Sequence, residues 1–227
     1  MTIRRLSLIA AASVVAVLGS GVALTAARAA DHPRYWRELA ARPAAPDALR
    51  MVAFGDSCVV GVGALDPRNS LVGRIARDLE QRTGRSVHVT NLAAAGATTD
   101  EILRDQVQRA DLATADLIVV ATPSDLESRV PLPDYRRDLL RFTALLPADR
   151  TVISDLPLEP GRNAYQSVLA DVADERRIRR ADFASVFTGP GRRLDIFSLL
   201  PPHLNDRGYR YWSDAFQRPT REIVPGG

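Results

Sequence analysis

Short apolar runs alternate along this chain with longer segments in which apolar side chains recur every three or four residues. The short runs predict buried strands at Met51–Phe54, Val87–Leu92, Leu117–Ala121 and Ala181–Val186, and a fourth strand in chain order that begins with Thr151–Ser154. The periodic segments predict helices at Ser70–Gln81, Tyr135–Leu146, Asn163–Ile178 and Asn205–Phe216. A further helix is predicted to follow the capping box at Thr98–Glu101. Strands that are apolar throughout are typical of a parallel sheet with helices on both faces. The pattern therefore predicts an α/β fold, a three-layer α/β/α sandwich around a five-stranded parallel sheet.

The first thirty residues have a different pattern, typical of export. Met1–Arg5 is short and basic, Leu6–Ala26 is apolar or small throughout, and Ala27-Arg28-Ala29 matches an A-x-A cleavage site. The apolar run is also nearly long enough to span a bilayer. Residues 1–30 are therefore expected to be a signal peptide or an N-terminal membrane anchor. Either would export the rest of the chain, secreted or tethered to the outer face of the cytoplasmic membrane.

The remaining chain divides into a lead-in, one domain and a tail. Residues 31–48 are rich in Ala and contain Pro43 and Pro46, which predicts a linker or a lead-in lying on the surface. Residues 49–220 carry all the predicted strands and helices, and residues 221–227 form a short tail.

Composition limits the chemistry. All 30 basic residues are Arg, so Schiff bases, Ser–Lys dyads and phosphate-binding loops ending in Gly-Lys are excluded. Three His and the single Cys58 argue against a zinc site of the Cys/His type, and no metal or other cofactor is expected. Residues 1–30 hold three Arg and no acids, which leaves 27 Arg against 27 acidic residues in the rest of the chain. This balance gives no support for a nucleic-acid partner.

Candidate catalytic residues follow the first three predicted strands, and ligands of parallel sheets bind at that edge. A serine hydroxyl needs an adjacent base before it becomes a good nucleophile. Of the three histidines, only His203 lies late in the chain near such a loop; His32 and His88 are expected to be structural or on the surface. The relevant blocks are Gly55-Asp56-Ser57-Cys58, Asn91 to Gly96, Thr122-Pro123-Ser124-Asp125 and His203 to Tyr209.

The order and spacing of these blocks resemble the GDSL family of hydrolases, also called the SGNH family, over nearly all of residues 50–217. The resemblance implies a flavodoxin-like SGNH hydrolase fold. It implies that Ser57 is the nucleophile and His203 the general base. It also implies that the backbone N–H groups of Ser57 and Gly96 bind the developing oxyanion.

Two blocks depart from the family pattern. The family has Gly-x-Asn-Asp in the third block, where the Asn donates to the oxyanion; here Ser124 takes that place with a shorter side chain. The family has Asp-x-x-His in the last block, where the Asp orients the imidazole; here the residue is Leu200. Asp195, Asp206 or a backbone carbonyl would then have to accept the Nδ1 proton of His203.

The resulting hypothesis is an exported serine esterase that cleaves a small-molecule, lipid or acylated-glycan ester through an acyl-enzyme. Acyl transfer to another acceptor would use the same site. The alternative is a weak or inactive SGNH-like domain that binds a glycan or a lipid. A dinucleotide-binding fold is a poor match, since Gly61-Val62-Gly63 lacks a third glycine at the required spacing, and no Gly-x-Ser-x-Gly elbow surrounds Ser57.

Overall fold

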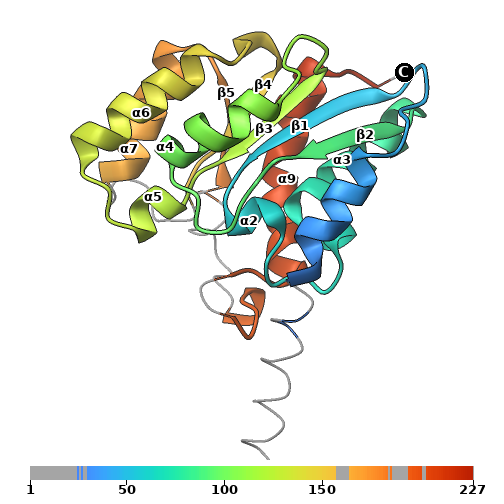
Figure 1. Cartoon of the computed structure of the whole chain (residues 1–227), viewed down its shortest axis with the longest axis horizontal. Coiled ribbons are helices and arrows are strands. Elements are labelled where there is room, and N and C mark those ends of the chain that lie inside the picture. The colour runs from blue at the N-terminus through green and yellow to red at the C-terminus, as the bar shows by residue number, and fades with distance from the viewer. Residues whose placement is uncertain are drawn as a thin grey trace, which may run out of the picture.

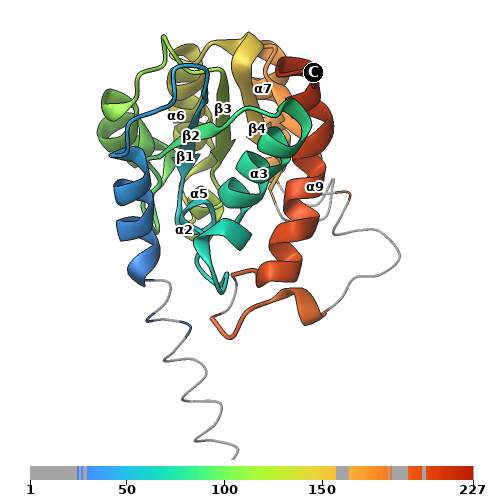
Figure 2. The same cartoon turned by 90° about the vertical axis from the view of Figure 1, so that its right-hand side faces the viewer.

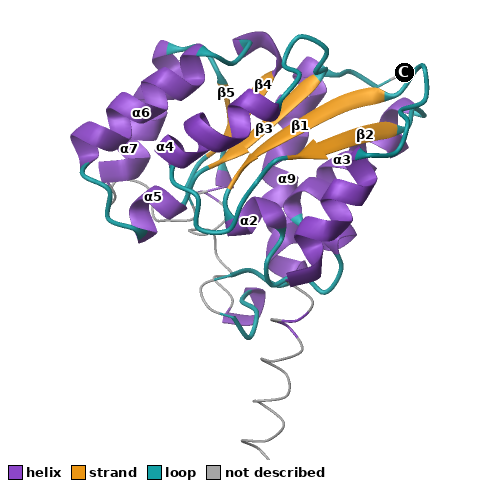
Figure 3. Ribbon diagram, in the orientation of Figure 1, coloured by secondary structure: helices purple, strands orange, loops and turns teal. Residues whose placement is uncertain are grey.

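The computed structural model describes residues 25, 27, 30–156, 164–183, 185, 194–200 and 203–226. Its strands are β1 (Leu49–Gly55), β2 (Val87–Asn91), β3 (Leu117–Ala121), β4 (Thr151–Ser154) and β5 (Arg179–Ala181). Its α-helices are α2 (Ser57–Val60), α3 (Leu71–Thr83), α4 (Thr99–Glu101), α5 (Ser124–Glu127), α6 (Leu132–Ala144), α7 (Ala164–Glu175) and α9 (Asp206–Ile223). Short 3-10 segments are η1 (Pro67–Asn69), η3 (Val107–Arg109), η4 (Ala148–Arg150) and η5 (Leu194–Ile196), and η2 (Ile102–Gln106) is a π-helical turn (Figures 1 and 3).

The five strands form one parallel sheet in the order β2-β1-β3-β4-β5. This confirms the predicted fold class. The chain leaves β1 toward β2 on one side and then crosses to β3 on the other, so the order reverses beside β1. In open α/β sheets, ligands bind in the crevice at such a switch point, beyond the carboxyl ends of the strands.

Side chains of the strands alternate between two cores. Met51 and Ala53 of β1 pack with α3 and α9, whereas Val52 and Phe54 pack with α6 and α7. Figures 1 and 2 show these helix pairs on opposite sides of the sheet. Burial on both faces explains why the central strands are apolar throughout.

The last strand was predicted too late in the chain. β5 is Arg179–Ala181, which pairs with β4 in the register Val152↔Arg179, and not Ala181–Val186. An edge strand pairs with only one neighbour and can therefore carry charged side chains. The two arginines of β5 form ion pairs, Arg179 with Glu222 and Arg180 with Asp155. Residues 184 and 186 of the predicted strand lie outside the described residues.

The segment predicted as a linker or surface lead-in contains a docked helix. Residues 31–40 are helical, and Trp36 is 3% exposed, with its indole N–H donating to the Val60 carbonyl at 2.9 Å. The burial of one large aromatic side chain explains why an Ala-rich segment is fixed against the domain.

The two ends of the domain differ in what the structure covers. Most of residues 1–30, for which a signal peptide or an anchor is expected, lie outside the described residues. Among those described, no helix is both long and apolar enough to cross a membrane. At the other end, α9 continues through Pro219 to Ile223 and so includes the first three residues of the predicted tail.

Candidate active site

A sharp turn carries Ser57 from the end of β1 into α2. Gly55 has a φ of +154°, and a Cβ at this position would lie 2.3 Å from the Ala121 carbonyl oxygen, so only glycine fits. Asp56 caps the short helix by accepting from the Cys58 N–H at 2.9 Å. Ser57 is the first residue of α2 and is 8% exposed. The turn therefore holds the hydroxyl at the carboxyl edge of the sheet.

His203 contacts this hydroxyl from the other end of the chain. Its Nε2 lies 3.0 Å from Ser57 Oγ, and its Nδ1 lies 2.9 Å from the Leu200 carbonyl oxygen. Because a carbonyl oxygen can only accept, the Leu200 contact assigns the ring proton to Nδ1. Nε2 is then the unprotonated nitrogen and can take the serine proton. The structure thus brings together a serine and a base 146 residues apart.

Neither acid proposed to orient His203 reaches it. The Asp195 carboxylate pairs with the Arg207 guanidinium, and the Asp206 carboxylate accepts from the Leu65 N–H at 2.8 Å and from the Asn69 side-chain amide at 2.9 Å. Of the three expected acceptors, only a backbone carbonyl, that of Leu200, is within hydrogen-bond distance of the His203 imidazole.

The loop that presents His203 is held by main-chain and amide contacts. Ser198 N–H donates to the His203 carbonyl at 2.8 Å, and the Asn205 side chain caps α9 while donating to the Asp195 and Phe197 carbonyls. Gly208 allows a close approach, because a Cβ there would lie 2.5 Å from the Ile196 carbonyl oxygen. These contacts fix the loop against the start of α9.

Ser124 lies beside the site but does not donate into it. Its hydroxyl donates to Asp56 Oδ2 at 2.6 Å, its N–H donates to the same oxygen at 2.8 Å, and the residue is 1% exposed. The expectation that Ser124 binds the oxyanion is therefore wrong, since its only hydroxyl proton is used on Asp56. Burial raises the pKa of Asp56 to about 6, against the lowering effect of these donors.

The family model for GDSL-like lipases and acylhydrolases matches residues 53–211. The chain belongs to this family. Membership supports a hydrolase that acts on ester bonds. No curated protein matches the chain.

Several solved structures share the fold. A lipase/acylhydrolase from Enterococcus faecalis aligns with a TM-score of 0.63 at 20% identity, over 76% of this chain and 95% of that one. The psychrotrophic esterase EstA from Pseudoalteromonas sp. gives 0.61 at 12% identity, over 76% and 97%. The salicylyl-acyltransferase SsfX3 of a tetracycline biosynthetic pathway gives 0.59 at 20% identity, over 79% and 56%. At these identities the likeness shows the fold alone.

The GDSL-like domain ties its three strand-end loops together through buried carboxylates. Asp56 joins the loop after β1 to Ser124 in the loop after β3. Asp125 in turn accepts from the N–H of Thr99 at 3.0 Å and from its hydroxyl at 2.7 Å, in the loop after β2. Asp125 is 2% exposed, and burial raises its pKa to about 6. The loops that surround Ser57 are therefore held as one unit.

Sequence reasoning missed Gln106, which contacts the backbone of Gly55 in the turn that leads to Ser57. Its amide accepts from the Gly55 N–H at 3.1 Å and donates to the Gly55 carbonyl at 2.8 Å, and the residue is 2% exposed. It ends η2, and such π-helical turns are frequent at functional sites. A glutamine in a helical pattern is usually on the surface, so the sequence offered no signal for this contact.

Gly96 and Cys58 complete the immediate surroundings. Gly96 is exposed with a φ of +77°, and a Cβ there would meet no atom within 4 Å. Glycine suits this left-handed turn, and the space beside it is open. Burial raises the pKa of the Cys58 thiol well above its ordinary value, which keeps it protonated and a poor rival to Ser57.

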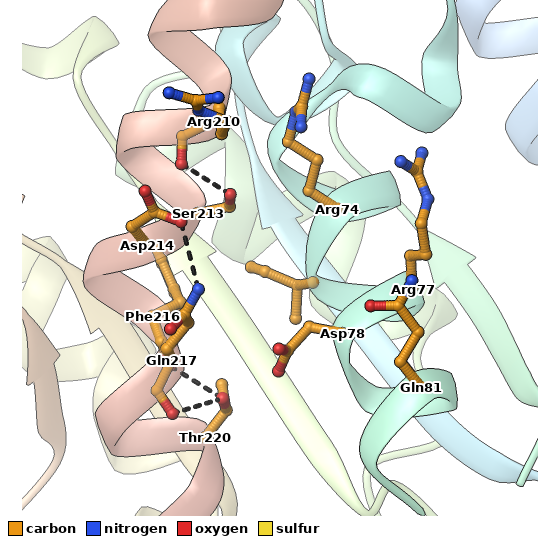
Figure 4. Close-up of a pocket in the computed structure, with 11 residues that line it drawn as sticks. Arg74, Arg77, Asp78, Gln81, Arg210, Ser213, Asp214, Phe216, Gln217 and Thr220 are labelled. Atoms are coloured by element: carbon orange, nitrogen blue, oxygen red, sulfur yellow. Dashed lines mark hydrogen bonds between the residues drawn. The ribbon is translucent and has the colours of Figure 1, made fainter. Parts of the chain in front are cut away.

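A separate cavity of about 210 Å³ lies between α3 and α9, away from the Ser57–His203 pair (Figure 4). Its walls carry charges of both signs, Arg74 and Asp78 from α3 and Arg210 and Asp214 from α9. Neither Ser57 nor His203 lines it, so it is separate from the candidate active site. No group of three or more metal-ligating side chains occurs in the part of the chain that the structure describes.

Proposed function

We propose that the protein is a serine esterase that cleaves carboxylic esters through an acyl-enzyme on Ser57. The observation that carries this proposal is the 3.0 Å contact between Ser57 Oγ and His203 Nε2, with Nδ1 held by the Leu200 carbonyl. A hydroxyl and an unprotonated imidazole nitrogen at hydrogen-bond distance form a nucleophile with its base.

In the first step, Ser57 Oγ attacks the ester carbonyl carbon while its proton moves to His203 Nε2. The imidazolium keeps its Nδ1–H on the Leu200 carbonyl, and its new Nε2–H is then given to the departing alcohol oxygen. The C–O bond of the ester breaks, and the acyl group remains on Ser57. Water then attacks this acyl-enzyme, His203 takes its proton, and the acid leaves as Ser57 recovers its hydrogen.

Backbone N–H groups would bind the oxyanion in both steps. The Ser57 N–H lies in the first turn of α2, where backbone donors have no partner within the helix. The Gly96 N–H, in the exposed turn after β2, is the second proposed donor. With Ser124 engaged by Asp56, this site has one side-chain donor fewer than the family pattern, and each such donor is worth about 10²–10³ in rate.

The substrate class is a small-molecule, lipid or acylated-glycan ester. The mechanism uses only side chains and main chain and requires no cofactor. We propose that residues 1–30 export the domain, either as a signal peptide or as an anchor that keeps it at the outer face of the cytoplasmic membrane.

The test compares the full chain with Ser57→Ala and His203→Ala in fluorophosphonate labelling and in burst hydrolysis of short p-nitrophenyl esters. Both variants are expected to lose turnover by about 10⁴ or more, because nucleophile and base act as one unit. Ser213→Ala on α9 and His88→Ala on β2 are matched controls that change the same residue types away from the site. Both controls should label and turn over as the wild type does.

A folded wild-type protein that neither labels nor turns over would reject the esterase. The alternative would then be a GDSL-like domain that binds a glycan or a lipid without cleaving it. Activity that persists in Ser57→Ala would reject the acyl-enzyme on that residue.

A further inference from the structure

Exposed apolar side chains gather around the loop that carries His203. Among the described residues, the large hydrophobic side chains that are exposed are Leu65 (57%), Leu145 (53%), Phe197 (38%) and Leu199 (48%). Leu145 lies between α6 and β4, at the opposite edge of the sheet from Ser57. The other three lie in the segment just before His203 and in the loop that follows α2. We name Leu65, Phe197 and Leu199 the apolar rim.

Direct contacts join the two loops of the apolar rim. A Cβ at Gly63 would lie 2.3 Å from the Leu204 carbonyl oxygen and 2.9 Å from Ser198 Oγ, so the backbones touch there. Leu65 N–H donates to Asp206 at 2.8 Å, and Ser198 N–H donates to the His203 carbonyl at 2.8 Å. The rim therefore lies on two loops that contact each other and the main chain of His203, the residue that contacts Ser57.

The N-terminal chain arrives at this rim. Leu65 lines a cavity together with Asp31 and His32, which belong to the helical residues 31–40. Figures 1 and 2 show that this helix, in blue, begins at the same end of the molecule as α2 and the orange segment around η5. The sequence immediately before it contains the apolar run Leu6–Ala26, which has no charged residue.

We propose that the apolar rim docks on a lipid bilayer, so that the active site faces the membrane that the N-terminal segment enters. The rim lies at the end of the domain from which residues 31–40 lead back toward the N-terminus, and the sequence before them is apolar, so one membrane would bury both apolar features. Among the described residues beside the rim, three ion pairs occur, Arg34 with Asp31, Arg68 with Asp66 and Arg207 with Asp195. Docking is therefore driven by apolar burial and does not require anionic lipid.

This inference rests on the proposed function and narrows its substrate. An ester carried in a bilayer, such as an acylated lipid, would reach Ser57 without crossing open water. Water-soluble esters would use the same catalytic pair but gain nothing from docking.

The test uses the full chain in which Cys58→Ala removes the native cysteine and Ser57→Ala prevents turnover. A single new cysteine, at Leu199→Cys or at Leu145→Cys, carries an environment-sensitive fluorophore. It is mixed with vesicles of dioleoylphosphatidylcholine that carry a nitroxide on the acyl chain. We expect the fluorescence emission at position 199 to shift to shorter wavelength and to be quenched by the nitroxide, because the rim enters the lipid. The emission at position 145 should show neither change. Replacing half of the lipid with an anionic one should leave the result at position 199 unchanged.

A second measurement links docking to turnover in the chain with an intact Ser57. The ratio of hydrolysis of a vesicle-borne ester to hydrolysis of p-nitrophenyl acetate should fall about tenfold or more in Leu65→Ser/Leu199→Ser, since each apolar side chain kept from lipid costs a factor of this order. Leu145→Ser should keep the wild-type ratio.

Three outcomes at position 199 would overturn the proposal. Fluorescence that stays water-like on vesicles would place the rim in solvent. A blue shift without lipid that grows with protein concentration would indicate a second copy as the occupant. A blue shift without lipid at every concentration would indicate that the chain covers its own rim. Quenching at 199 in a protein that never hydrolyses an ester would support docking and reject only the esterase.

Discussion

His203 is oriented by a main-chain carbonyl, where the family pattern has a carboxylate. The Leu200 carbonyl fixes the tautomer as an Asp would, because both groups accept the Nδ1 proton at hydrogen-bond distance. A carbonyl carries no full charge, however, and stabilises the imidazolium less. We therefore expect a working site that turns over more slowly than one with a carboxylate at this position.

The nearest upstream acid provides a direct test of this assignment. Asp195→Asn is expected to keep kcat/KM within about threefold of wild type, because its carboxylate pairs with Arg207 and not with His203. Loss of a true orienting acid costs about 10⁴ in rate in other serine hydrolases. Steady-state hydrolysis of a p-nitrophenyl ester separates the two cases, and a loss of that size would show that Asp195 moves onto the imidazole.

At the scale of elements, the nucleophile turn depends on neighbours that are distant in sequence. Gln106 on η2 holds both polar groups of Gly55, while Asp56 and Asp125 connect the loops after β1, β3 and β2. Ser57 itself makes few of these contacts, so its position is set by the packing of the elements around it.

Gln106→Leu is expected to lower the free energy of unfolding by about 1–3 kcal/mol, because it removes the Gln106 partner of the buried Gly55 N–H, whereas the Gly55 carbonyl keeps the Ala94 N–H at 3.2 Å. It should also lower kcat more than KM, since the turn that presents Ser57 loses its support. Urea unfolding and steady-state kinetics measure the two effects.

Gln106→Glu is the conservative comparison, because its carboxylate can accept from the Gly55 N–H but cannot donate to the Gly55 carbonyl. It should lie between wild type and the Leu variant in stability. Wild-type kinetics in Gln106→Leu would show that the turn is self-supporting.

The buried carboxylates make stability depend on pH. The pKa values of Asp56 and Asp125 are each raised to about 6 by burial, so between about pH 4 and 6 the folded state binds protons that the unfolded state releases. Their contribution to stability is fully present below about pH 4 and is lost as the pH rises through 6. We expect stability to fall by about 2 kcal/mol per group between pH 4.5 and 7.5.

Urea unfolding across this range checks the sign. Asp125→Asn should show a shallower fall than wild type, because one of the two titrating groups is gone. Stability that rises from pH 4.5 to 7.5 would contradict the assignment. Hydrogen bonds with Arg68 lower the pKa of Asp66 to about 2. Its contribution to the free energy of unfolding is therefore lost only below about pH 4, outside the range of this experiment.

For the whole molecule, the helix at residues 31–40 is part of the folded domain. Trp36 fills the core shared by α3 and α9, and its indole N–H holds the Val60 carbonyl at the end of α2. The N-terminal chain is thus attached to the element that starts with Ser57, which couples any membrane attachment of residues 1–30 to the orientation of the active site.

Trp36→Ala is expected to lower the free energy of unfolding by about 3–5 kcal/mol, as for other large-to-small core substitutions. Arg37→Ala, on the exposed side of the same helix, should change it by no more than about 0.5 kcal/mol. Denaturant unfolding of the full chain followed by circular dichroism measures both. Equal effects would indicate that the helix is not docked in solution.

The sequence by itself determined the architecture and the order of the candidate catalytic blocks. Leu117–Ala121 was predicted to the residue and the start of the fourth strand at Thr151 was predicted correctly, because strands buried on both faces must be apolar throughout. The edge strand β5 was misplaced for the same reason, since one exposed face permits arginines. The blocks around Ser57 and His203 were recognisable because their order and spacing resemble the pattern of the GDSL family.

Only the tertiary structure decided how the site is held. The Leu200 carbonyl, the amide of Gln106 and the hydroxyl of Ser124 each act through a contact that no periodicity of the sequence announces. Backbone acceptors exist at every residue, and the partners of Gln106 and Ser124 lie 51 and 68 residues away. Local patterns report which face of an element is buried, whereas the partner of a buried polar group is chosen by which elements the fold brings together.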